Sequence, residues 1–231
     1  MSQVTPLLVS CAVVFDGWVA TRSTGNRPTD TQLLDAAAAA FRRDGYRATS
    51  MAAIADEADT TKPTLYAHFG GKEQLYVQVV AREVEALRAV MFETYDASLA
   101  LPVRDEVRAN ILDFFRFAHS NPGGFHLIFT EDDGPASAEE LRRSLVQSLV
   151  DRIAEHIRSR TRGAGLEAPR IGSDVLAHLV VGVAVSGAKQ VIAESLDPHS
   201  VGDLAVALVA DGLIHIPAET VARVAADSGT P

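Results

Sequence analysis

Residues 49–72 constrain the fold most, because they read as two short helices joined by a tight turn. Ser50 is a favourable N-cap, and apolar residues follow it at helical spacing as far as Ala58. Asp59 tolerates the turn or left-handed conformation that closes a helix, and Thr61 can cap the second helix. Helices this short cannot bury their apolar faces alone. We therefore expect them to pack on a third helix that lies directly upstream.

The second short helix has the chemistry of an element that reads DNA. Its first residues are short, polar or basic, and its N-terminus directs N–H groups and the positive end of the helix dipole towards phosphate. Hydroxyl, imidazole and ammonium donors follow and could hold the backbone on either side. A short helical hairpin that only connects larger elements would show the same spacing. The candidate DNA-binding residues are Thr61, Lys62, Pro63, Thr64, Tyr66, His68 and Lys72.

Residues 29–76 resemble the DNA-binding domain of the tetracycline-repressor family of transcriptional regulators. The matching motifs are Phe41-Arg42-Arg43-Asp44-Gly45-Tyr46, Ala48-Thr49-Ser50, Ile54-Ala55 with Ala58, Lys62-Pro63-Thr64-Leu65-Tyr66-Ala67-His68-Phe69 and Lys72-Glu73-Gln74-Leu75. The resemblance implies that Lys62, Pro63 and Thr64 face bases. It also implies that Thr61, Tyr66, His68 and Lys72 hold phosphates.

Two features depart from the family pattern. Asp59 stands in the turn where the family usually has glycine, and it adds a negative charge near the DNA. Ala52 and Ala53 replace a polar contact and a capping acid, so the capping box of the first short helix is half empty. These changes affect the expected DNA affinity of that helix and leave the expected fold unchanged.

The charge is distributed as a DNA-binding chain requires, although the whole chain of 231 residues carries −9. Residues 22–82 hold eight basic and seven acidic side chains, which gives +1 and leaves −10 for the rest. The acidity thus lies outside the DNA-reading part, where it discourages non-specific contact with DNA. The single cysteine, Cys11, excludes an intramolecular disulfide and fits the cytoplasm.

Residues 1–28 are expected to be either an N-terminal arm or a stretch upstream of the true start. An apolar run lies within them, but no Lys or Arg precedes Arg22, although a signal peptide would require a basic residue there.

The pattern of residues 77–216 predicts a second helical domain, with helices near 72–97, 103–119, 136–160, 171–193 and 198–216. Only 14 residues, 175–188, separate Asp174 from Lys189 in the most apolar helix, and they include His178, so this stretch is too short and too interrupted to span a membrane. Residues 217–231 lack a periodic apolar pattern and predict a frayed tail.

Aromatic residues and histidines gather in the middle of the second domain. Each of them is more often a core residue than a ligand contact, but together they could line a pocket for a small molecule. The resemblance implies such a pocket, whose effector changes the spacing of two DNA readers in a dimer. The candidate ligand-binding residues are Phe92, Phe114, Phe117, His119, Phe125, His126 and Phe129.

The last two helices expected in this domain are apolar at three- and four-residue steps. Periodicity alone allows them to be core of one subunit, or to pair with their copies across a two-fold axis. The resemblance implies the pairing. The candidate dimer residues are Leu176, Leu179, Val183, Gly187, Leu204, Leu208 and Leu213.

These patterns predict an all-α protein with an N-terminal three-helix helix-turn-helix domain and a C-terminal ligand-binding and dimerisation domain. The expected function is a homodimeric, cytoplasmic repressor that binds a near-palindromic double-stranded operator and is released by a small-molecule effector. We expect no cofactor, metal or membrane partner. No catalytic motif or paired metal spacing is present in the sequence, so an enzyme is not expected. The alternative is a helical module that binds another protein without specific DNA binding.

Overall fold

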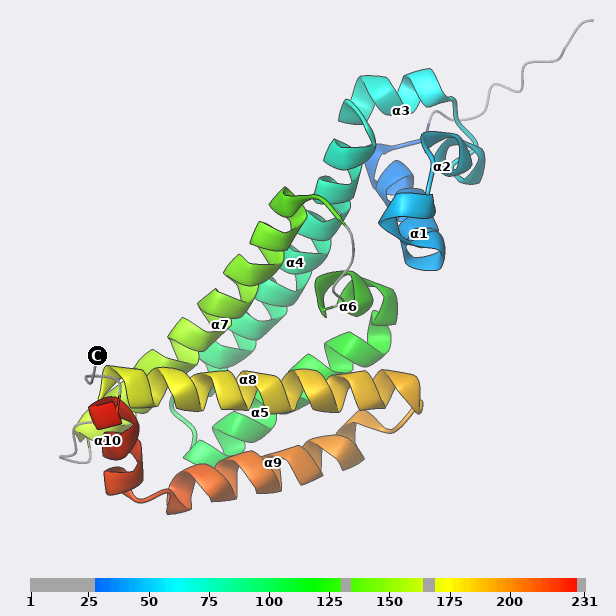
Figure 1. Cartoon of the computed structure of the whole chain (residues 1–231). Coiled ribbons are helices and arrows are strands. Elements are labelled where there is room, and N and C mark those ends of the chain that lie inside the picture. The colour runs from blue at the N-terminus through cyan, green and yellow to red at the C-terminus, as the bar shows by residue number, and fades with distance from the viewer. Residues whose placement is uncertain (1–27, 130–133, 164–168, 228–231) are drawn as a thin grey trace, which may run out of the picture.

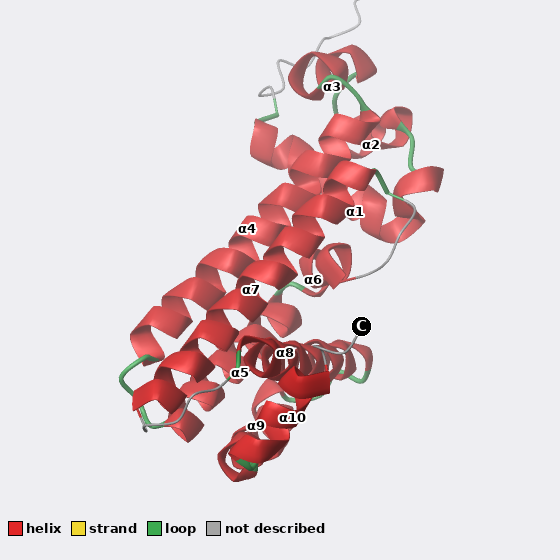
Figure 2. Ribbon diagram, turned by 60° about the vertical axis from the view of Figure 1, so that its left-hand side comes forward, coloured by secondary structure: helices red, strands yellow, loops and turns green. Residues whose placement is uncertain are grey.

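The computed structural model describes residues 28–129, 134–163 and 169–227. These residues form ten α-helices and, within the described ranges, no strand (Figure 2). The predicted all-α class is therefore confirmed. Figure 1 shows a small cluster, α1–α3, at one end of a long helix, and the remaining helices along and across its other end.

The small cluster is the expected three-helix unit, made of α1 (Asp30–Ala48), α2 (Met51–Glu57) and α3 (Lys62–Phe69). A capping box between Thr29 and Gln32 begins α1. The hydroxyl of Ser50 accepts a hydrogen bond from the Ala53 amide and begins α2. Leu33, Ile54 and Leu65, one from each helix, are fully buried against one another in the core cluster. The upstream helix α1 packs on α2 as predicted, whereas α3 packs mainly on α2 and on the start of α4.

The turn between α2 and α3 has the backbone conformation that its sequence suggested. Asp59 lies in the left-handed region at φ 47°. Gly45 also has a positive φ of 75° and interrupts the regular path of α1 near its end. The hydroxyl of Thr49 then donates to the Gly45 carbonyl at 2.7 Å and so fixes the entry into α2.

The longest helices, α4 (Lys72–Ser98) and α7 (Ala136–Gly163), lie side by side along the molecule (Figures 1 and 2). α5 (Val103–Ser120) packs against α4, while α8 (Arg170–Ala193) and α9 (Pro198–His215) pack across α5. The short helix α6 (Pro122–Phe129) contacts α1, α4 and α5. α10 (Ala218–Asp227) rests on α8.

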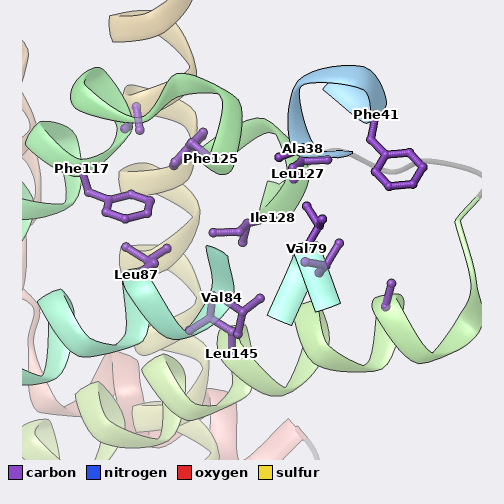
Figure 3. Close-up of a cluster of buried hydrophobic side chains, with 14 of the residues drawn as sticks. Ala38, Phe41, Val79, Val84, Leu87, Phe117, Phe125, Leu127, Ile128 and Leu145 are labelled. Atoms are coloured by element: carbon purple, nitrogen blue, oxygen red, sulfur yellow. The ribbon is translucent and has the colours of Figure 1, made fainter. Parts of the chain in front are cut away.

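One apolar core connects the small cluster with the long helices (Figure 3). In this core Phe41 of α1 lies near Leu127 of α6 and Val79 of α4, and Leu145 reaches it from α7. A contiguous packed core transmits displacement, because close-packed interiors compress little. The three-helix unit is therefore packed against the rest of the chain through α4 and α6.

The structure corrects three expectations from the sequence. The sequence predicts that residues 122–124 only end the preceding helix, but they form the first turn of α6, which begins at Pro122. The frayed tail expected over 217–231 is wrong for Ala218–Asp227, which form α10. α8 is long and apolar enough to cross a membrane by length and composition, although only 28% of its most apolar window is buried. One such helix is weak evidence for a membrane span, because a core helix of a soluble protein meets the same criterion. Residues 1–27 and 228–231 lie outside the described residues.

Candidate DNA-reading surface and effector cavity

The start of α3 presents a short polar surface. The Thr61 hydroxyl accepts from the Thr64 amide at 3.3 Å and lies 2.9 Å from the Thr64 hydroxyl. Lys62 and Pro63 are exposed beside this cap, and Tyr66 is 52% exposed one turn later. The structure thus brings five of the seven predicted DNA-binding residues to one end of a single helix.

The other two predicted DNA-binding residues already have partners within the chain. His68 Nδ1 lies 2.6 Å from Asp30 Oδ1 at the start of α1. Lys72 Nζ donates to the Arg47 carbonyl at 3.1 Å and lies 4.6 Å from the centroid of the Tyr46 ring. These contacts fasten α3 and the start of α4 to α1. The two side chains therefore help to position α3 relative to α1.

Aromatic side chains and a buried arginine connect α1 to the rest of the molecule. Tyr76 of α4 packs edge-on against Phe41 and at a tilt against Tyr46, both of α1, with ring centroids 4.8 Å apart in each pair. Arg142 of α7 donates to the Tyr76 hydroxyl at 2.7 Å and to the carbonyl of Leu127 in α6 at 2.8 Å. Because Arg142 is buried, these charge-assisted bonds are shielded from water. They hold α4, α6 and α7 together next to α1.

A second polar connection runs from α6 through α4 to α1, and it begins at Asn121, which precedes α6 and accepts from the Gly124 amide of that helix at 3.0 Å. Asn121 Nδ2 donates to Glu83 at 2.8 Å, and Glu83 accepts from Arg82 at 2.8 Å. Arg82 also donates to Asp35 of α1 at 2.7 Å. Burial alone would lower the pKa of Arg82, but the hydrogen bonds to Glu83 and Asp35 outweigh it and raise that pKa. Arg82 therefore stays charged, and links α1 to α4.

The second domain contains an apolar cavity of about 390 Å³. It lies among α4, α5, α7 and α8, and residues of α9 and α10 close it. This volume falls within the range of sites for small molecules. Its apolar wall includes Met91, Phe92, Val107, Ile111, Leu149, Ile153, Leu176, Val180, Leu213, Ile214, Ile216 and Val221.

Polar groups gather at one part of this cavity. The buried carboxylate of Glu106 lies 2.9 Å from His156 Nε2 and accepts from Arg160 at 3.0 Å. The hydroxyl of Tyr95 donates to the Arg152 carbonyl at 3.1 Å. Burial, with a smaller contribution from the charge of Glu106, raises the pKa of Tyr95 to about 12, so the phenol stays neutral. The cavity can thus hold a mostly apolar molecule that has a polar end.

The candidate ligand residues are not brought together at this cavity. Phe92 lines it, whereas Phe114, Phe125 and Phe129 pack on one another with ring centroids 4.6–5.8 Å apart. Phe117 is also buried, in the core shown in Figure 3. The other two, His119 and His126, are exposed.

Sequence reasoning missed Tyr95, Asn110, His156 and Arg160, which line the polar part of the cavity. A usable signal was present for one of them: His156 lies between Ile153 and Ile157, both on the apolar stripe of α7. A polar residue beside such a stripe at a partly buried position indicates a polar contact inside the protein.

The candidate dimer residues divide between two environments. Leu179, Leu204 and Leu208 are 62–72% exposed on α8 and α9. Gly187 instead packs within the subunit, because a β-carbon there would lie 2.6 Å from the Phe115 ring. The remaining three, Leu176, Val183 and Leu213, are half-buried. Of these, Leu176 and Leu213 line the cavity. The structure therefore leaves an exposed apolar strip on α8 and α9, which we call the α8–α9 strip and which also includes Ile171 and Val175.

Comparison with known proteins identifies the family of this chain. Residues 33–79 match the model described as "Bacterial regulatory proteins, tetR family". The HTH-type transcriptional activator FasR of Mycolicibacterium smegmatis is 33% identical over 205 residues, which are 84% of this chain and 88% of FasR. The chain belongs to the tetR family. The HTH-type transcriptional repressor KstR of Rhodococcus jostii is 37% identical over 65 residues, 28% of this chain and 31% of KstR. The chain accordingly belongs to a family of bacterial transcriptional regulators.

Solved structures support the same fold. A TetR-like transcriptional regulator from Rhodococcus sp. RHA1 has a TM-score of 0.68 at 24% identity and covers 81% of this chain and 96% of its own. The transcriptional regulator FadR of Bacillus subtilis, solved in complex with stearoyl-CoA, has a TM-score of 0.64 at 12% identity. The match covers 78% of this chain and 97% of the FadR chain. The family shares the two-part helical organisation described above.

Proposed function

We propose that this tetR-family protein is a homodimer that binds a near-palindromic operator and leaves it when a small molecule fills the α4–α5–α7–α8 cavity. The observation that carries the proposal is the position of α4. One end of this helix follows directly on the reading helix α3, and its other end lines the cavity. A ligand that favours one placement of α4 changes the separation of the two readers, and hence the DNA affinity.

The cavity supports an elongated, mainly apolar effector with one polar end, such as an acyl chain. Its apolar wall and localised polar groups match that class of ligand. FadR of Bacillus subtilis, which shares the fold, was solved with stearoyl-CoA. We also propose repression in the cytoplasm, by occlusion of a promoter. FasR, in contrast, is named an activator, and the position of the operator relative to the promoter decides between the two modes.

Substitutions in α3 test the DNA-reading assignment. Thr64→Ala should change the preferred base at one or two operator positions, because Thr64 is assigned to the bases. Tyr66→Phe removes an exposed hydroxyl and should weaken binding to all sequences alike, by about threefold, which corresponds to one lost hydrogen bond of about 0.7 kcal/mol. Binding measured against an operator library separates the two effects. A uniform loss for Thr64→Ala would contradict its assignment.

The alternative, a protein-interaction module, makes the opposite prediction for salt. A DNA reader loses affinity steeply as salt concentration rises, because counterions are released from the phosphates. A helical interaction module has no salt-sensitive affinity for duplex DNA. The family membership of residues 33–79 and the exposed polar start of α3 favour the reader.

A further inference from the structure

Four residues separate the effector cavity from a second hollow on the surface. Phe92 and Tyr95 of α4 and Arg152 and His156 of α7 line the cavity, and the same four line an open groove of about 590 Å³. We call these four residues the partition. The far side of the groove is formed by Leu99, Ser148, Asp151, Glu155 and Ser159. The partition therefore borders both the apolar cavity and the more open groove.

Arg152 is the central side chain of the partition. Its guanidinium carbon lies 4.7 Å from the Phe92 ring centroid and 4.5 Å from that of Tyr95. One terminal nitrogen pairs with Asp96 of α4, which is exposed. Its Nε is buried and has no hydrogen-bond partner among the described residues. An arginine only donates hydrogen bonds, so this donor is available to an acceptor that enters the site.

The other cationic side chains at the cavity are already engaged. Arg160 donates to the Glu106 carboxylate, and also to the carbonyls of Leu99 and Leu101. His156 lies beside the same carboxylate. A ligand acceptor at that position would compete with a buried, doubly held carboxylate. Arg152, whose own partner Asp96 is a solvent-exposed carboxylate, is the cation at the cavity that can change partners most easily.

We propose that the effector lies across the partition, and that Arg152 exchanges Asp96 for an acceptor oxygen of the effector. The apolar part of the effector occupies the cavity, and its polar end, a carboxylate or other carbonyl oxygen, meets the guanidinium at the groove. This inference rests on the effector cavity of the proposed function. It adds the position of the polar end, the residue that holds it and the carboxylate it displaces.

The exchange acts directly on α4. Asp96, Tyr95 and Phe92 all belong to α4, and their contacts with Arg152 join the cavity end of this helix to α7. Loss of the Asp96 contact loosens that end, while the other end of α4 remains fixed to α1 through Lys72 and Tyr76. Arg152 is thus a ligand-binding residue, and its change of partner alters the contacts of α4, the helix that positions the reader.

The test uses the full-length protein and two probes with the same twelve-carbon chain, dodecanoate and dodecylamine, below their micelle concentrations. Calorimetry at pH 7.5 should show that the wild type binds dodecanoate more tightly than dodecylamine. Asp96→Asn removes the competing carboxylate and should tighten dodecanoate binding about two- to fivefold. Arg152→Leu keeps an apolar side chain in the partition, and should weaken dodecanoate binding about tenfold and abolish the preference.

Asp203→Asn is the matched control, because Asp203 also forms an exposed ion pair, with Arg108 between α5 and α9. It should bind both probes as the wild type does. The inference is overturned if the wild type binds dodecanoate but neither Asp96→Asn nor Arg152→Leu changes that binding, or if the wild type prefers the amine. If neither probe binds the wild type at all, the acyl-type effector of the proposed function fails together with it.

Discussion

Asp59 combines two features, a left-handed backbone conformation and a negative charge. Its φ of 47° is a conformation that aspartate tolerates better than most residues do. The sequence predicted this turn because Asp59 follows a helical run and precedes a capping threonine. The partners of His68 and Lys72 could not be predicted in this way, because Asp30 and Arg47 are distant in sequence and only the packing of α1 brings them close.

Substitution of Asp59 separates charge from backbone conformation. Asp59→Asn removes the negative charge and keeps a side chain that tolerates positive φ, whereas Asp59→Gly removes both the charge and the strain. Both variants should bind operator DNA about two- to fivefold more tightly at low salt, since one repulsive charge near phosphate is lost. Filter binding at low and high salt measures this. Improvement in the glycine variant alone would show that backbone conformation, not charge, limits affinity.

At the scale of elements, helix periodicity predicted the long helices well. The expected 72–97 and 103–119 correspond to Lys72–Ser98 and Val103–Ser120. α6 was missed because Pro122 and two glycines favour a break, and only tertiary contacts with α1 and α4 show that they begin a helix. The cavity was misplaced for a related reason. The aromatic side chains that lie close together in the sequence pack on one another in the core, whereas the cavity is lined by residues from several helices.

The polar connection of α6, α4 and α1 predicts an unequal effect of two neighbouring glutamates on α4. Glu83→Gln should lower the free energy of unfolding by about 1–2 kcal/mol, because a nearly buried carboxylate that accepts from Arg82 and Asn121 loses its charge. Glu85→Gln, at an exposed carboxylate paired with Arg88, should change it by less than about 0.5 kcal/mol. Urea unfolding measures both. Equal losses would mean that the connection contributes no more than a surface ion pair.

At the scale of the whole molecule, the α8–α9 strip exposes large apolar side chains that nothing in the described part of the single chain covers. Leu204 and Leu208 are exposed one helical turn apart, and Leu179 adds to them from α8. Several large apolar side chains exposed on two neighbouring helices are typical of an interface. The sequence predicted an interface on α8 and α9, and the exposed leucines lie on these two helices. It could not separate the faces of those helices, because both are apolar and one of them lines the cavity.

Charges placed in the α8–α9 strip should prevent dimer formation. The double variant Leu204→Asp/Leu208→Asp should elute as a monomer and bind the operator at least 100-fold more weakly, because one half-site is lost from each complex. The same substitution at the exposed Leu101, in the turn between α4 and α5, should leave the assembly state unchanged. Sedimentation measures the assembly state. A double variant that remained dimeric would place the interface elsewhere on the molecule.

If the two readers of a dimer bind a specific operator, the DNA that flanks this protein's own gene is the first place to look for it. The measurement is duplex binding by the purified full-length protein at 50 and 200 mM salt, followed by footprinting. We predict a protected near-palindrome with half-sites about one helical turn or more apart, and an affinity that falls steeply between the two salt concentrations. Binding no tighter than to random duplex, repeated with a genomic library, would contradict specific operator binding and favour a protein-interaction module.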